Sequence, residues 1–149
     1  MTRWFGMILL CLLTLFTIAT PALAKDSWHQ FSAKEAQVGK VGTDSLKPGI
    51  RLYMKGEKHG KVIKQLGEFK SNKRSNSFGK SARSSCDRAF ISALMSLQDR
   101  AEKEGGNAVI DIYSITRDKQ FESVEEYSCI RGGFVTNVAL MGTVAELAD

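Results

Sequence analysis

Residues 81–110, SARSSCDRAFISALMSLQDRAEKEGGNAVI, carry the pattern of one long amphipathic helix followed by a strand. Apolar side chains recur there at intervals of three and four residues, as on one buried helix face: Cys86, Ala89, Phe90, Ala93, Leu94, Leu97 and Ala101. Ser81 or Ser84 can cap the beginning of the helix, and Gly105-Gly106 can end it in a left-handed turn. We therefore predict a helix that packs a single face on a sheet.

Strands are expected after this helix. Residues 107–116 alternate in polarity, which predicts a strand with Ile110 and Ile112 on the same face. After a polar turn, a return strand begins near Glu125. This strand is either long or broken in two at Gly132-Gly133, where glycine permits a bulge or a close backbone approach.

Two further strands are expected before the helix. Residues 50–54 alternate in polarity, residues 55–60 predict a turn, and residues 61–69 predict a second strand, so we expect a hairpin. Residues 70–81 are polar and contain four cations and no acid, which predicts a surface loop.

The resulting order, β-β-α-β-β, predicts an α+β fold: a two-layer sandwich of one main helix on a small, mostly antiparallel sheet. Residues 49–149 are expected to form this single domain. Residues 25–48 are less regular. We expect an arm or a short helix there, because Ser32 and Glu35 have the spacing of a capping box.

The first 24 residues have the pattern of a secretory signal peptide. Arg3 precedes an apolar run, Pro21 interrupts it, and Ala22-Leu23-Ala24 supplies the small residues of a cleavage site. The run is shorter than the roughly 18 residues that a membrane-spanning helix needs. We therefore predict cleavage between Ala24 and Lys25, release into the periplasm and no membrane span in the mature chain.

Export determines how the cysteines are interpreted. Cys11 lies within the signal peptide, in the middle of its apolar run, and its position does not fit a lipoprotein cleavage site. The mature chain keeps Cys86 and Cys129, an even pair in an oxidising compartment and without CxxC spacing. We predict a disulfide between them. Closing the loop would stabilise the fold by about 4 kcal/mol through the entropy of the unfolded chain.

The charge pattern suggests an anion site. The full chain carries a net charge of +5, and removing residues 1–24 removes Arg3 and no acid, so +4 remains. The cations Lys73, Arg74, Lys80 and Arg83 lie around the predicted helix start at Ser81. Free backbone N–H groups and the helix dipole favour anions at such a position. Lipid phosphate or a sugar acid could bind there; the alternative is a solvated, charged loop.

Several chemical activities lack support in the sequence. Gly79-Lys80-Ser81 ends like a phosphate-binding loop, but the first glycine of that pattern is replaced by Arg74, so we expect no nucleotide hydrolysis. A lone aromatic residue, Phe78, in the basic loop disfavours nucleic acid. Glu57 and His59 are the only local pair of metal ligands, and the chain has no GxSxG motif. We therefore expect no catalytic residues, no metal and no cofactor.

Several motifs of the chain resemble a family of small exported bacterial proteins that often carry the label "excinuclease ATPase subunit" or a similar excinuclease ABC name. The resemblance covers about residues 50–147. It rests on Gly79-Lys80-Ser81, Cys86, Ala93-Leu94, the segment Gly-Asn-Ala-Val-Ile-Asp-Ile at 106–112, Tyr127-x-Cys129-x-x-Gly132-Gly133, and Gly142-Thr143. More distantly, the chain is similar to YbjQ-type domains and to the RcsF envelope-stress sensor.

This resemblance implies a cell-envelope protein with one helix on a small sheet and a helix-to-strand disulfide. The lipidated cysteine and the second cysteine pair of RcsF have no counterpart here. YbjQ-type domains form rings, which implies a homo-oligomer as a further expectation. No catalytic residue carries over from the resemblance.

Together, these patterns predict a non-enzymatic periplasmic protein that binds an envelope protein or an anionic envelope ligand. Two alternatives remain open: a small periplasmic enzyme acting on an envelope substrate, and a lipid-headgroup binder that uses the basic loop at 70–83.

Overall fold

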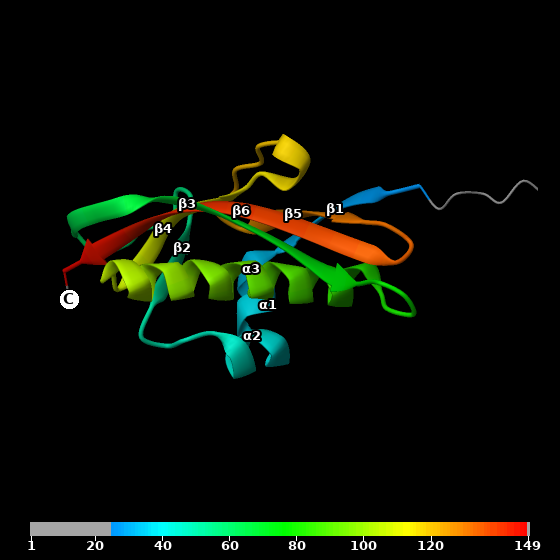
Figure 1. The fold of residues 1–149 in the computed structure, drawn as a ribbon, viewed down its shortest axis with the longest axis horizontal. Coiled ribbons are helices and arrows are strands. Elements are labelled where there is room, and N and C mark those ends of the chain that lie inside the picture. Colours follow the sequence, from blue (N-terminus) through cyan, green and yellow to red (C-terminus); the bar gives the residue numbers. More distant parts are fainter. Residues whose placement is uncertain (1–24, 149) are drawn as a thin grey trace, which may run out of the picture.

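The structure, a computed structural model, describes residues 25–148, so the predicted signal peptide lies outside the described residues. It is an α+β fold in which one main helix packs on a curled, mixed sheet of six strands, a half-barrel (Figure 1). The strands are β1 (Ser27–Ser32), β2 (Arg51–Met54), β3 (Val62–Asn76), β4 (Ala108–Ser114), β5 (Glu126–Arg131) and β6 (Val135–Leu147).

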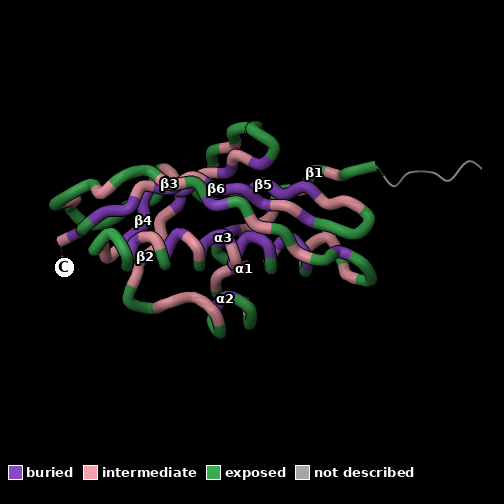
Figure 2. Tube along the Cα trace, in the orientation of Figure 1, coloured by how far each residue is buried: buried purple, intermediate pink, exposed green. Residues whose placement is uncertain are grey.

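The long helix has the predicted position and ends. Helix α3 spans Ala82–Glu104; the hydroxyl of Ser81 accepts a hydrogen bond from the N–H of Ser84, and Gly105 ends the helix in the left-handed conformation. All seven residues of the predicted apolar stripe are buried. They pack on the sheet in one continuous core, which lies between α3 and the strands in Figure 2.

Strand β6 is the centre of the sheet. One of its edges pairs with β3 along almost its entire length, and its other edge pairs first with β5 and then with β4. Strand β1 adds antiparallel to β5, and β2 adds parallel to β4. The predicted antiparallel character therefore holds for every ladder except the one between β2 and β4.

The predicted hairpin of β2 and β3 is wrong. The strand order β2-β4-β6-β3 places the two strands on opposite sides of a central pair, so the connection at 55–61 crosses between them. The sequence pattern identified β2 and the first part of β3 as strands. Pattern alone does not choose a partner, and each of these strands pairs with a strand that is more distant in the sequence.

The predicted surface loop at 70–81 is mostly strand. β3 continues to Asn76, and only 77–81 connects it to α3. This part of β3 has a single neighbour, and its residues on the helix side are small or polar, such as Ser71 and Lys73. A polar edge strand lacks the apolar alternation that reveals a buried strand.

Strand β4 departs from the predicted alternation. Ile110 packs in a small separate cluster, whereas Ile112 lies in the main core. Asp111 between them has φ 52°, and the register with β6 shifts there. Such a bulge rotates the following side chain to the other face of the sheet.

The return strand is broken in two, one of the two predicted possibilities, and Gly132-Gly133 lies in the turn between β5 and β6.

Residues 25–48 belong to the same structure. Ser32 caps the short helix α1 (Ala33–Val38) by accepting a hydrogen bond from the N–H of Glu35, as its spacing predicts. Helix α2 (Lys40–Ser45) follows, and β1 is a strand that the sequence did not reveal.

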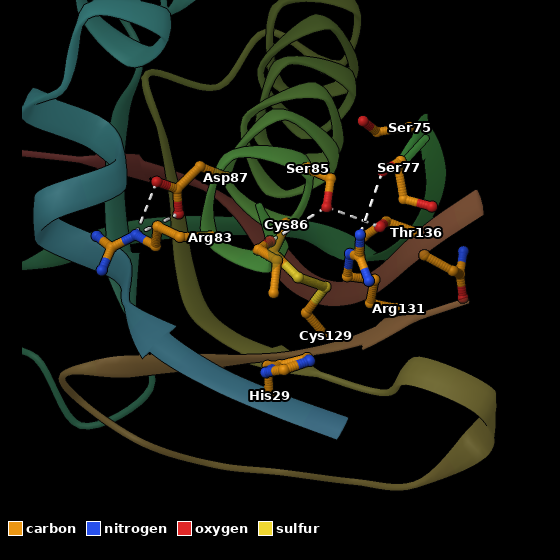
Figure 3. The surroundings of a disulfide bond; sticks show 12 residues. His29, Ser75, Ser77, Arg83, Ser85, Cys86, Asp87, Cys129, Arg131 and Thr136 are labelled. Carbon is orange, nitrogen blue, oxygen red and sulfur yellow. Dashed lines mark hydrogen bonds and ion pairs between the residues drawn. A yellow bond between two sulfur atoms is a disulfide. The ribbon is translucent and has the colours of Figure 1, made fainter. Parts of the chain in front are cut away.

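A disulfide joins Cys86 of α3 to Cys129 of β5, with a Cα–Cα distance of 5.9 Å. Both cysteines are fully buried. Figure 3 shows the bond between the first turns of α3 and the sheet beneath it. The cross-link therefore fixes the helix start, next to the connection at 77–81.

Candidate functional site

Two loops that are far apart in sequence meet at the end of the molecule where α3 begins (Figure 1). One is the β3–α3 connection at 77–81, and the other is the β5–β6 turn at 132–134. The N–H of Ser77 donates to the carbonyl of Phe134 at 2.9 Å, and the Ser77 hydroxyl donates to the carbonyl of Gly132 at 2.8 Å. These hydrogen bonds hold the two loops against each other.

Arg131 of β5 adds further hydrogen bonds to the β3–α3 connection. Its guanidinium donates to the carbonyls of Lys80 at 2.9 Å and of Ser77 at 3.3 Å, and Figure 3 shows it reaching from β5 toward Ser77. The Nε atom of the same side chain is buried without a hydrogen-bond partner among the described residues. Since hydrogen bonds from a charged donor are strong, Arg131 fixes the position of the connection before α3.

The junction presents an exposed pair of aromatic rings. Phe78 and Phe134 stack with ring centroids 5.8 Å apart, yet they remain 68% and 72% exposed. Val135 beside them is 48% exposed. These side chains and Arg74 line an open groove of about 580 Å³, and we call Arg74, Phe78, Phe134 and Val135 the aromatic tip. Contiguous apolar side chains on a rigid support mark an interaction site more often than scattered ones do.

Cations accompany the aromatic tip. Arg74 is the only charged residue that lines the groove, and no side chain among the described residues pairs with it. Within the same part of the chain, the Lys80 ammonium contacts only the carbonyl of Asn76, at 3.4 Å. The groove therefore has a positive edge and no acid in the wall that the described residues form.

The five residues of the predicted anion site do not form a single cluster. Lys73 lines a pocket on the helix side together with Asp99 and does not line the groove of the tip, whereas Arg74 borders both that pocket and the groove. Ser81 is occupied as the helix cap. Only Arg74 and Lys80 accompany the tip.

Arg83 is held in a separate network. Its guanidinium binds Asp87 of α3 at 2.8 Å and Glu35 of α1 at 2.9 Å. These contacts, with Asp87 first, raise the pKa of the Arg83 guanidinium. The hydroxyl of buried Tyr127 donates to the same Asp87 carboxylate at 2.5 Å. The Arg83 guanidinium is therefore used to join α1 to α3, and Asp87 links this pair to β5.

A second cavity, of about 520 Å³, lies against the tip and shares Arg74 and Phe134 with it. Its other cations are paired: Lys70 with Asp118 at 3.4 Å, and Arg117 with Asp26. Because each of these two cations already has an acid, the cavity offers little charge to a ligand. Its pairs connect the short 3-10 helix η1 (Thr116–Asp118) to β3 and to Asp26, the residue before β1.

One contact resembles part of a hydrolytic site. The Ser27 hydroxyl lies 2.8 Å from Nε2 of His29 on β1. A nucleophile and its base need a third group that orients the base, and His29 instead stacks on Phe31 with centroids 5.6 Å apart.

Within the described part of the chain, no cluster of three or more potential metal ligands is found. Between residues 25 and 148, no helix has the length and apolarity needed to cross a membrane.

Sequence reasoning identified Arg74 and Lys80 but missed the aromatic pair. In the sequence, Phe78 stands alone in the basic loop, and the pattern predicts Phe134 at a core position, which is wrong because Phe134 is exposed in the turn between β5 and β6. The signal that could have found them is weak: each phenylalanine lies next to glycine in a connecting segment, where burial is rare.

Comparison with family models found no match for this chain, and comparison with curated proteins found none either.

Proposed function

We propose that this chain is an exported, non-enzymatic binding protein of the cell envelope that works through the aromatic tip. The observation that carries the proposal is the stacked pair Phe78 and Phe134, which stays exposed although the hydrogen bonds of Ser77 hold the two loops against each other. Burying these rings against a partner would stabilise the complex by about 25 cal/mol per Å² of apolar surface that is removed from water.

Export supports this assignment. The sequence pattern of residues 1–24 predicts passage across the membrane, and the Cys86–Cys129 disulfide is the kind of cross-link that persists in an oxidising compartment. The similarity in motifs to small exported bacterial proteins points to the same compartment. Ring formation, which that similarity also implies, has no specific contact surface in its favour.

Site-specific photo-crosslinking in living cells tests the proposal. Benzoylphenylalanine replaces Phe78, Phe134 or, as the control, Ile63, which is 60% exposed on β3. We expect adducts from the two tip positions and none from Ile63, as judged by the mass of the purified chain. Equal yields at all three positions, or no adducts at the tip, would contradict the proposed function.

The alternative is a small envelope hydrolase, which only the contact between Ser27 and His29 favours. A fluorophosphonate probe distinguishes the two functions because it labels activated serines. Labelling of Ser27 that disappears in the S27A variant would support the hydrolase. The binding proposal predicts no labelling.

A further inference from the structure

The aromatic tip lies at the end of the molecule where the described chain begins. Ser27 of β1 pairs with Arg131, the residue before the β5–β6 turn. Asp26 lies so close to this turn that a Cβ on Gly132 would be 2.8 Å from its carboxylate. Figure 1 shows the start of β1, the β5–β6 turn and the β3–α3 connection at the same end, opposite the C-terminus.

The predicted signal peptide would join this end of the domain to the membrane before cleavage. The apolar run of residues 4–19 has the pattern of a signal-peptide core, and it ends only a few residues before Lys25. A domain that is joined to such a segment presents to the bilayer the end at which its chain begins. That end carries Phe78 and Phe134.

The chemistry of the tip matches an anionic bilayer surface. Aromatic rings are favoured in the headgroup region, where one part of the environment is apolar and the other is wet. Among the described residues, Arg74 and Lys80 have no acidic partner, and the nearby carboxylate of Asp26 is already paired with Arg117. A free anion would instead need several converging donors, whereas a single cation lines this open groove.

We propose that the aromatic tip docks the exported domain on the surface of bilayers that contain anionic phospholipid. Phe78, Phe134 and Val135 enter the headgroup region, and Arg74 and Lys80 contact lipid phosphates. This inference rests on the proposed function, since it names the partner of the same tip.

Vesicle sedimentation of the mature chain, residues 25–149 with the disulfide intact, tests the inference. Vesicles contain phosphatidylcholine alone or with roughly 30% phosphatidylglycerol, at low salt. We expect binding to the anionic vesicles that weakens as salt rises. The R74Q/K80Q variant is expected to bind about thirtyfold more weakly, since each cation near an anionic surface contributes about 1 kcal/mol.

Two further variants distinguish binding through the aromatic tip from nonspecific adsorption of the protein to vesicles. The F78S/F134S variant should lose vesicle binding with unchanged thermal unfolding, because both rings are exposed in the native fold. The matched I63S variant removes a similarly exposed apolar side chain elsewhere, on β3, and should bind as the parent does.

Absence of binding by the parent chain, equal binding to both kinds of vesicle, or full binding by F78S/F134S would overturn the inference. Crosslinks from the tip to a protein, combined with no vesicle binding, would overturn the lipid assignment alone and leave the proposed function standing. Absence of both crosslinks and vesicle binding would remove both.

Discussion

Buried Tyr127 and half-buried Asp87 form a hydrogen-bonded pair, and each lies close in sequence to a cysteine of the disulfide. The Tyr127 ring stacks on Phe90 with centroids 3.9 Å apart, and its hydroxyl donates to Asp87. Burial, followed by this hydrogen bond to a carboxylate, raises the pKa of the Tyr127 phenol far above its ordinary value of about 10. The native fold therefore disfavours the phenolate, while the unfolded chain forms it freely.

This pair predicts a specific loss of stability in alkali. A raised pKa in the folded state means that the stabilisation is complete below about pH 10 and is lost as the pH rises above that value. We expect the free energy of unfolding in urea to fall above about pH 10, and to fall less steeply in the Y127F variant. The Y113F variant is the comparison: burial and a hydrogen bond to Glu68 also raise the pKa of Tyr113, but this side chain is only half-buried, so Y113F should change the slope less than Y127F does. Parallel pH profiles for the parent and Y127F would contradict the assignment.

The distance between helix α3 and the sheet depends on one small residue of β6. A Cβ on Gly142 would lie 2.7 Å from Cγ1 of Val109 and 3.3 Å from atoms of Ile112 and Leu97. Leu97 belongs to α3 and the other two to β4, so an added methyl group pushes on both elements. Glycine at this position permits the close approach of helix and sheet.

We therefore expect the G142A variant to lose about 1–3 kcal/mol in free energy of unfolding, as overpacked cores do. The matched control is G49A, where a Cβ would meet no atom within 4 Å. Urea unfolding of both variants measures the difference. Similar stabilities for G142A and G49A would show that the core at Gly142 adapts without cost.

The elements differ in how far their sequence determines them. Helix α3 was predictable, because each of its signals acts over a short stretch of sequence: apolar residues recur every three or four positions, Ser81 caps the first turn, and Gly105 ends the last turn. Strand partners were not predictable, since β2 and β3 pair with strands that come after α3 in the chain. β1 escaped detection because it is an edge strand of mixed polarity that contributes little to the core.

The candidate site depends on the whole molecule in the same way. The basic residues Arg74 and Lys80 stand out in the sequence as a cluster of charge. The pairing of Phe78 with Phe134 does not, because it requires a contact between distant positions that only the hydrogen bonds of the folded loops establish. Arg83 illustrates the opposite error: a cation next to a helix start is used internally, by Asp87 and Glu35.

The disulfide makes the stability of the whole fold depend on whether the surroundings are oxidising or reducing. It closes a loop between positions 43 residues apart, and both of its sulfurs are buried between α3 and β5. Reducing it would lower the free energy of unfolding by about 4 kcal/mol, a large share of what a domain of this size possesses. The protein should therefore be markedly less stable wherever thiols are kept reduced.

Expression in two compartments measures this dependence. The chain 1–149 is expressed, recovered from the periplasm and denatured without reductant. Its mass should be that of a chain that begins at Lys25, and it should take up no thiol reagent. The chain 25–149, made without the signal in a reducing cytoplasm, should take up two thiol labels and unfold at lower urea. Adding reductant should bring the periplasmic protein to the same midpoint, and should leave a C86A/C129A variant unchanged. A periplasmic chain with free thiols, or one that retains residues 1–24, would contradict export with cleavage as the source of the cross-link.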